Sequence, residues 1–149
     1  MSSPRHVTAL VLAFVLAAVV AVPTPVAVPS PVLPEQFRWA RPPGVDGIEG
    51  AWVVGAEAGP GLYALRVKLR AGARMPPHTH PDPRHTTVLS GTLYVGFGAV
   101  VDESAAVAVP TGAVYVAPAG VAHWVWAKDG DVQYQETGVG PTGTTPVAR

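Results

Sequence analysis

The 149-residue sequence contains no cysteine and few charged side chains. The absence of cysteine excludes disulfide scaffolds and cysteine-ligated zinc or iron–sulfur sites. Only 13% of the residues are charged, and ten basic residues balance ten acidic ones. This balance excludes the basic footprint of a nucleic-acid-binding protein. Any bound metal must therefore be held by nitrogen or oxygen ligands.

Apolar residues make up 48% of the chain, but they are unevenly distributed. Residues 1–6 are polar and include Arg5, whereas residues 7–22 are apolar except for Thr8. This pattern is typical of a secretory signal peptide, and cleavage is expected near Ala21. The alternative is an uncleaved N-terminal membrane anchor, although the run is shorter than the roughly 18 residues expected of a spanning helix.

These features predict three segments. Residues 1–21 form a signal peptide, residues 22–34 form a proline-rich linker, and residues 35–149 form the folded domain. The mature protein is expected to be secreted or periplasmic, with no stable membrane span after processing.

The folded part is divided into short segments by glycine and proline. Between residue 34 and the C-terminus, the longest stretch without either is the 11 residues 99–109, about the length of one average helix. The segment 62–71 alternates strictly, with Tyr63, Leu65, Val67 and Leu69 on one face. Such alternation indicates a half-buried strand. Further strands are expected over 52–54, 86–89, 92–97, 105–109, 114–117, 124–127 and 132–137, which together predict an all-β sandwich or barrel.

Histidine is concentrated around one short segment. His78, His80 and His85 lie within eight residues, and His123 is the fourth histidine outside the signal peptide. In an extended strand, residues 78 and 80 point to the same face. Two imidazoles on one face form half of a site for zinc, copper, iron or nickel, and His123 could supply a third ligand.

At these residues the sequence resembles the cupin family in two gapped motifs. The first motif is matched by Gly72, then five residues, His78-Thr79-His80, and a final Gly91; the second is matched by Gly112, then five residues, Pro118-Ala119-Gly120, two residues and His123. The resemblance covers roughly residues 35–139. It implies a cupin-type double-stranded β-helix, or jelly-roll barrel, with His78, His80 and His123 as metal ligands.

The sequence departs from the family pattern at two positions. Arg84 stands where the family carries its metal-binding Glu, and Ala127 replaces the usual Asn. Allowing one residue more after His80 places His85 at the Glu position instead, so His85 is a candidate fourth ligand. A bulge would be needed to turn His85 inward. Arg84 is either a substrate-binding residue that holds a carboxylate or a solvated residue at the rim.

The resemblance implies two functions of different classes, because cupins share a fold and differ in activity. The first is an exported, metal-dependent, dioxygenase-like enzyme that uses Fe, Mn, Ni, Cu or Zn on a small organic substrate. The alternative is a non-catalytic module that binds or senses a metal or small ligand. An acid or base in the cavity would favour the enzyme. The only candidates are Tyr94, Tyr115, Gln133, Gln135 and Glu136, and Glu136 is expected where the chain leaves the barrel.

Two tryptophans bear on self-association. Trp124 and Trp126 alternate with His123 and therefore face away from the cavity if His123 faces inward. Packing in the core near Trp52 is the simpler explanation for them. A subunit interface is the alternative, since the resemblance to cupins also implies a homodimer.

Overall fold

The computed structural model describes residues 30–148, so the expected signal peptide and most of the linker lie outside the described residues. A compact unit spans Pro31–Arg149. No helix in the described range is long and apolar enough to cross a membrane. The elements are η1 (Pro34–Gln36), β1 (Ile48–Val54), β2 (Gly61–Leu69), β3 (Arg74–Thr79), β4 (Arg84–Ser90), β5 (Thr92–Phe97), η2 (Glu103–Ala105), β6 (Val107–Pro110), β7 (Val114–Ala117), β8 (His123–Trp126), β9 (Val132–Gly140) and β10 (Thr145–Pro146).

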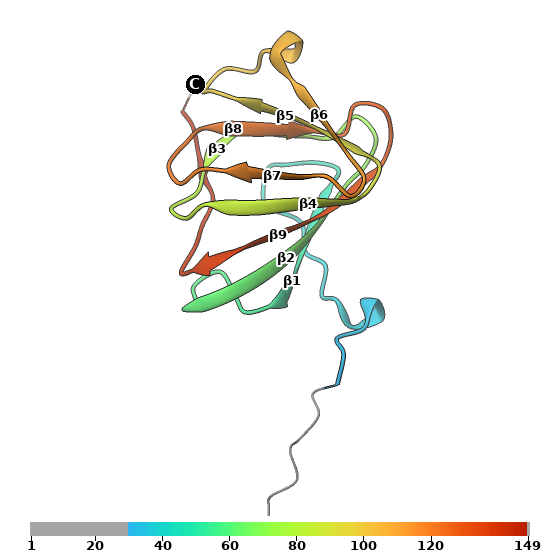
Figure 1. The fold of residues 1–149 in the computed structure, drawn as a ribbon, viewed down its shortest axis with the longest axis vertical. Coiled ribbons are helices and arrows are strands. Elements are labelled where there is room, and N and C mark those ends of the chain that lie inside the picture. Colours follow the sequence, from blue (N-terminus) through green and yellow to red (C-terminus); the bar gives the residue numbers. More distant parts are fainter. Residues whose placement is uncertain (1–29, 149) are drawn as a thin grey trace, which may run out of the picture. The chain divides into compact units, whose positions relative to one another are not determined.

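The strands form two five-stranded antiparallel sheets, most of whose strands are labelled in Figure 1. One sheet has the order β1-β2-β9-β4-β7, and the other has the order β10-β3-β8-β5-β6. Neighbours in each sheet are mostly far apart in sequence, as β2 and β9 show, and this is the pairing that a jelly roll requires. The predicted all-β, jelly-roll fold is confirmed.

The core follows the alternation read from the sequence. In β2, Tyr63, Val67 and Leu69 are buried, whereas Lys68 is exposed. Val67 and Leu69 belong to one cluster of apolar side chains from both sheets, which also includes Val88, Leu93, Val95, Val125 and Tyr134. Burial of these apolar surfaces between the two sheets is the main stabilising contribution.

A short N-terminal segment covers part of the outer face of β2. Lys68 Nζ lies 3.9 Å from the ring centre of Trp39, and the Arg66 guanidinium lies 5.4 Å from that of Phe37. Ala40 and Gly50 exchange two backbone hydrogen bonds of 2.8 Å, which fix the segment alongside β1. The cationic groups of Arg66 and Lys68 are therefore partly covered by aromatic rings.

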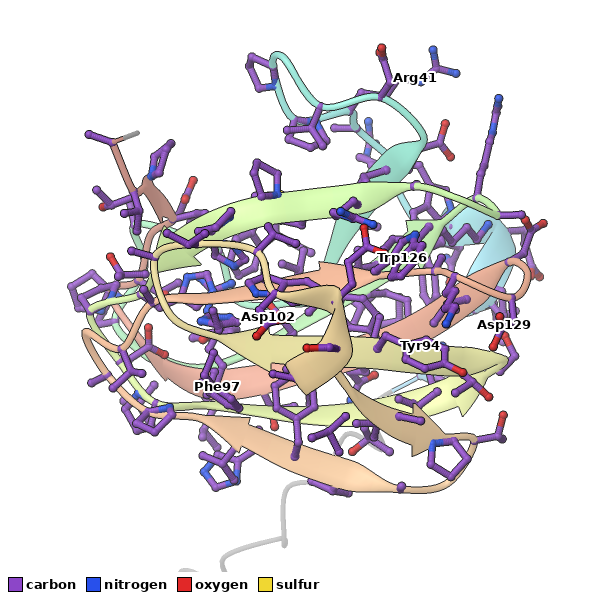
Figure 2. The ribbon with its side chains drawn as sticks, turned by 90° about the horizontal axis from the view of Figure 1, so that it is seen from above. Arg41, Tyr94, Phe97, Asp102, Trp126 and Asp129 are labelled. Atoms are coloured by element: carbon purple, nitrogen blue, oxygen red, sulfur yellow. The ribbon has the colours of Figure 1, made fainter. Side chains whose placement is uncertain are left out.

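The two tryptophans of β8 lie on the second sheet. Trp124 is fully buried and packs directly over Gly96, where there is no room for a Cβ atom. Trp126 lies beside Tyr94, whose hydroxyl donates to Asp129 at 2.5 Å (Figure 2). Trp124 thus packs within this sheet rather than against Trp52, whose ring contacts Tyr63.

Strands β3 and β10 were not among the expected strands. Two adjacent prolines, Pro76 and Pro77, obscure β3 in the sequence because proline cannot donate to a strand ladder. The pairing of β3 with β8 shifts register between Met75 and His78, and this irregularity accommodates the prolines. The shift sets the positions of the histidines that follow.

Candidate functional site

Three of the four expected histidines meet at one end of the second sheet. His78 in β3 pairs directly with His123 at the start of β8, and His80 follows β3 by one residue. One ring nitrogen from each lies within 4.8 Å of the other two, and all three side chains are buried. Ring centroids are 4.3 Å apart for His78 and His123, and 4.8 Å apart for His78 and His80. We call these three residues the histidine triad.

Backbone carbonyls orient each ring of the triad. Nδ1 of His78 lies 2.8 Å from Pro76 O, and Nδ1 of His123 lies 3.2 Å from Val121 O. Nδ1 of His80 lies 2.8 Å from Gly143 O. Because a carbonyl only accepts, each Nδ1 carries the hydrogen and each Nε2 carries a free lone pair. Metal-ligating histidines commonly have this outer hydrogen bond.

The environment keeps the triad neutral. Burial lowers the pKa of His78 to about 4, and it has the same effect on His80. Burial also lowers the pKa of His123. Neutral imidazoles at physiological pH are the form that binds metals.

The metal-free protein is expected to lose stability as the pH falls from about 6.5 towards about 4. In that window the unfolded chain protonates residues 78 and 80, whose ordinary pKa is 6.5, while the folded chain keeps them neutral. Urea unfolding at about pH 7 and about pH 5 measures the loss. The His78→Gln/His80→Gln variant should lose less over the same interval. An equal loss in both proteins would contradict the assignment.

The fourth candidate ligand lies elsewhere. His85 is exposed on the outer face of β4, opposite Val116 of β7. The register of β4 with β9 shifts only between Val88 and Ser90, so no bulge turns His85 inward. The structure therefore brings Arg84 to the inner face and leaves His85 outside the triad.

Arg84 is buried and ion-paired with a residue from a neighbouring strand. Its Nη1 group donates to Glu136 Oε2 at 2.7 Å, and the two side chains are 3% and 7% exposed. Its Nη2 group donates to Thr142 Oγ1 at 2.9 Å and to Gly143 O at 3.2 Å. Arg84 is thus not a solvated rim residue. A direct role in substrate binding stays a prediction, since its terminal nitrogens already have partners within the protein.

A buried polar network continues from this ion pair. Thr142 Oγ1 donates to Asp82 Oδ1 at 2.5 Å, and Tyr63 OH donates to Asp82 Oδ2 at 2.6 Å. Burial and the hydrogen bond to Asp82 raise the pKa of Tyr63 to about 12, so its hydroxyl remains a donor. Gly138 lies directly against Tyr63 and Asp82, and a Cβ atom there would collide with both.

A cavity of about 370 Å³ opens beside the triad, within the range of pockets that hold small organic ligands, roughly 300–1,000 Å³. His78, His80, Arg84 and Glu136 line it together with mainly apolar side chains, namely Ile48, Trp52, Leu65, Val67, Met75 and Tyr134. Arg38, Ala40, Arg41, Pro42 and Pro43 of the N-terminal segment also line it.

Comparison with known families identifies the fold. A family model described as "Cupin" matches residues 57–147, which is more than half of the chain. This chain belongs to the cupin family. No curated protein matches it.

Solved structures resemble this cupin in fold at low sequence identity. KdgF from Halomonas sp. is 22% identical with a TM-score of 0.59, and the match covers 82% of this chain and 96% of that one. The polyketide cyclase RemF from Streptomyces resistomycificus is 15% identical with a TM-score of 0.67, covering 82% and 87%. Salicylate 1,2-dioxygenase from Pseudoaminobacter salicylatoxidans, solved with gentisate adducts, is 15% identical with a TM-score of 0.58, covering 71% and 30%.

The structure adds two residues to the site of this cupin that the sequence analysis did not place there. Glu136 was expected where the chain leaves the barrel, but β9 continues to Gly140 and lies between β2 and β4. Asp82, which accepts from Tyr63 and Thr142, was not among the expected site residues. One face of β9 buries Val132, Tyr134 and Glu136. A carboxylate on an otherwise apolar, alternating face is the sequence signal that could have indicated that Glu136 points inward.

The donor set fits a transition metal. Nε2 of His80 is buried and has no hydrogen-bond partner within residues 30–148, which would be unfavourable for a buried acceptor unless something binds it. Imidazole nitrogens suit Fe, Mn, Ni, Cu and Zn to differing degrees, so the triad does not select among them.

Proposed function

We propose that this cupin binds one divalent transition metal through Nε2 of His78, His80 and His123. The observation that carries the proposal is the buried, unpartnered Nε2 of His80 in a triad whose Nδ1 atoms are all held by backbone carbonyls. The triad contains no carboxylate, so the metal would keep its full positive charge. Fe, Mn, Ni, Cu and Zn are the candidates.

We further propose that the metal serves a reaction of a small organic substrate. A three-histidine site leaves coordination positions open, and the cavity leads to two of the three ligands. A bound metal would polarise a substrate oxygen, and a redox-active one would also support dioxygenase-like oxidation. The presence of a buried acid in the cavity, Glu136, favours an enzyme over a passive binding site.

A non-catalytic module that binds a metal or small ligand is the alternative. This alternative is favoured by the hydrogen bonds that Arg84 donates within the protein, to Glu136, Thr142 and Gly143. They leave the cavity without a free buried cation that could bind a substrate anion. This alternative predicts stoichiometric metal and ligand binding without turnover. Oxygen consumption by the metal-loaded protein with a panel of small phenols, diketones and carboxylates separates the two functions.

Elemental analysis tests the metal proposal directly. Protein refolded without metal and then incubated anaerobically with Fe, Mn, Ni, Cu or Zn is expected to retain about one ion per chain of at least one metal after gel filtration. Retention of none of the five would contradict the proposal.

Export is also proposed, from the sequence pattern of residues 1–21. Intact mass and N-terminal sequencing of protein from the culture medium or periplasm should show a chain beginning near Val22. A full-length chain found only in the membrane fraction would support the N-terminal anchor instead.

A further inference from the structure

Glu136 is the buried carboxylate in the lining of the cavity beside the histidine triad. Of the two glutamates lining the cavity, Glu57 is exposed and Glu136 is only 5% exposed. His78 and His80 of the triad line the same cavity as Glu136. The cavity therefore contains imidazole nitrogens and a carboxylate that face the same space.

The carboxylate reaches this position from a different strand than the motif would suggest. The position of the expected motif Glu, on β4, is taken by Arg84, and the acid comes from β9. Glu136 pairs with Thr86, two residues along β4 from Arg84, so both charged side chains point to the same inner face. Their charges cancel, so this ion pair adds no net charge to the interior.

The ion pair with Arg84 engages only one carboxylate oxygen of Glu136. Arg84 donates to Oε2 at 2.7 Å, which leaves Oε1 for another partner. Arg84 is itself held by Thr142 and by the Gly143 carbonyl, the same carbonyl that orients His80. One strap, residues 142–143, thus positions both a triad imidazole and the arginine that holds the carboxylate.

We propose that Glu136 is the acid–base residue of this cavity and that its ligands are small, uncharged carbonyl compounds with an acidic C–H beside the carbonyl. This inference rests on the proposed metal site. The carboxylate of Glu136 accepts the C–H proton, and the electron pair of that bond moves to form the C=C bond of an enolate, whose oxygen takes the negative charge. The proton later returns to carbon or leaves to water, so no oxidant or reductant is consumed.

The ligand class follows from the lining of the cavity. Its walls are largely apolar, and its two buried charged side chains, Arg84 and Glu136, form an ion pair. A neutral molecule enters such a space without leaving a charge unpaired. The bound metal would supply the positive charge that stabilises an enolate oxygen. Arg84 acts as a positioning residue, because it sets the orientation of Glu136 and need not touch the ligand.

Deuterium uptake by acetylacetone in heavy water tests the proposal. The protein is loaded with Zn²⁺, which has no redox chemistry; metal content is measured first, and the ultraviolet band of the enolate reports binding. Wild-type protein should speed methylene exchange at least about 100-fold over the Arg84→Gln/Glu136→Gln variant. The paired substitution avoids an unpartnered buried charge, and the variant should still hold zinc.

Four further variants sharpen the test, namely Glu136→Asp, Arg84→Gln, Arg84→Lys and Glu103→Gln. Glu136→Asp retains the charge but withdraws the carboxylate, so it should slow exchange while leaving metal content unchanged. Arg84→Lys should restore part of the rate lost in Arg84→Gln, which a purely steric role would not produce. Glu103→Gln removes an exposed glutamate paired with Arg74 and should behave as wild type.

The outcomes distinguish the two proposals. Absence of zinc from wild-type protein, in the metal analysis, would contradict the metal site itself. Zinc-loaded wild type that neither binds acetylacetone nor accelerates exchange would overturn the ligand class. Equal exchange rates in wild type and the Arg84→Gln/Glu136→Gln variant, at equal zinc content, would overturn the role of Glu136.

Discussion

Replacing His78 by alanine is expected to abolish stoichiometric metal binding by this cupin. His78 is the central member of the triad, with its ring centroid 4.3 Å from that of His123 and 4.8 Å from that of His80. Loss of a residue that only orients a ligand lowers metal affinity about 10–100-fold, so loss of a ligand should lower it by more than about 100-fold. Competition with a chromophoric chelator measures the change.

His85→Ala is the matched control for this experiment. His85 lies seven residues along the chain and is exposed on the opposite face of β4, so its removal should leave metal affinity unchanged. Circular dichroism and urea unfolding of both variants show whether the fold persists. Full metal occupancy in His78→Ala would contradict the metal centre, and a large loss in His85→Ala would indicate a different ligand set.

The second large effect is expected from breaking the buried ion pair. In Glu136→Leu, the Arg84 guanidinium keeps its charge in a site that is 3% exposed and loses its anionic partner. Removing one member of a buried pair typically destabilises a protein by about 3–5 kcal/mol. The Arg84→Met/Glu136→Leu variant removes both charges and should recover most of that loss. The free energy of unfolding in urea measures both.

An exposed ion pair with the same nitrogen–oxygen distance provides the comparison. Arg74 and Glu103 are also 2.7 Å apart, but their side chains are 31% and 57% exposed. Glu103→Leu is expected to change the free energy of unfolding by roughly 0–1 kcal/mol, because water solvates the arginine that remains. Similar losses in Glu103→Leu and Glu136→Leu would show that burial does not control the energetics of these pairs.

Local patterns were sufficient to predict much of the fold. The alternation of Tyr63, Leu65, Val67 and Leu69 predicted the inner face of β2, and turn residues marked most of the other strands. Strands β3 and β10 were not predicted, because their prolines weaken the local strand pattern and their pairing depends on partners distant in sequence. Such partners become neighbours only when the sheets assemble.

In the candidate site, too, local sequence patterns determined some features and long-range strand pairing determined others. Sequence spacing was sufficient to place His78 and His80 on one face and to nominate His123, because strand periodicity and the two motifs are local properties. The inward direction of Arg84 and the outward direction of His85 depended on where the bulge in β4 falls, which is set by its register against β9. The pairing of Arg84 with Glu136 joins residues 52 positions apart, and their charges meet because β4 and β9 are adjacent in the sheet. The amino-acid order thus specified which imidazoles could share a site, whereas long-range strand pairing specified which charges stand beside them.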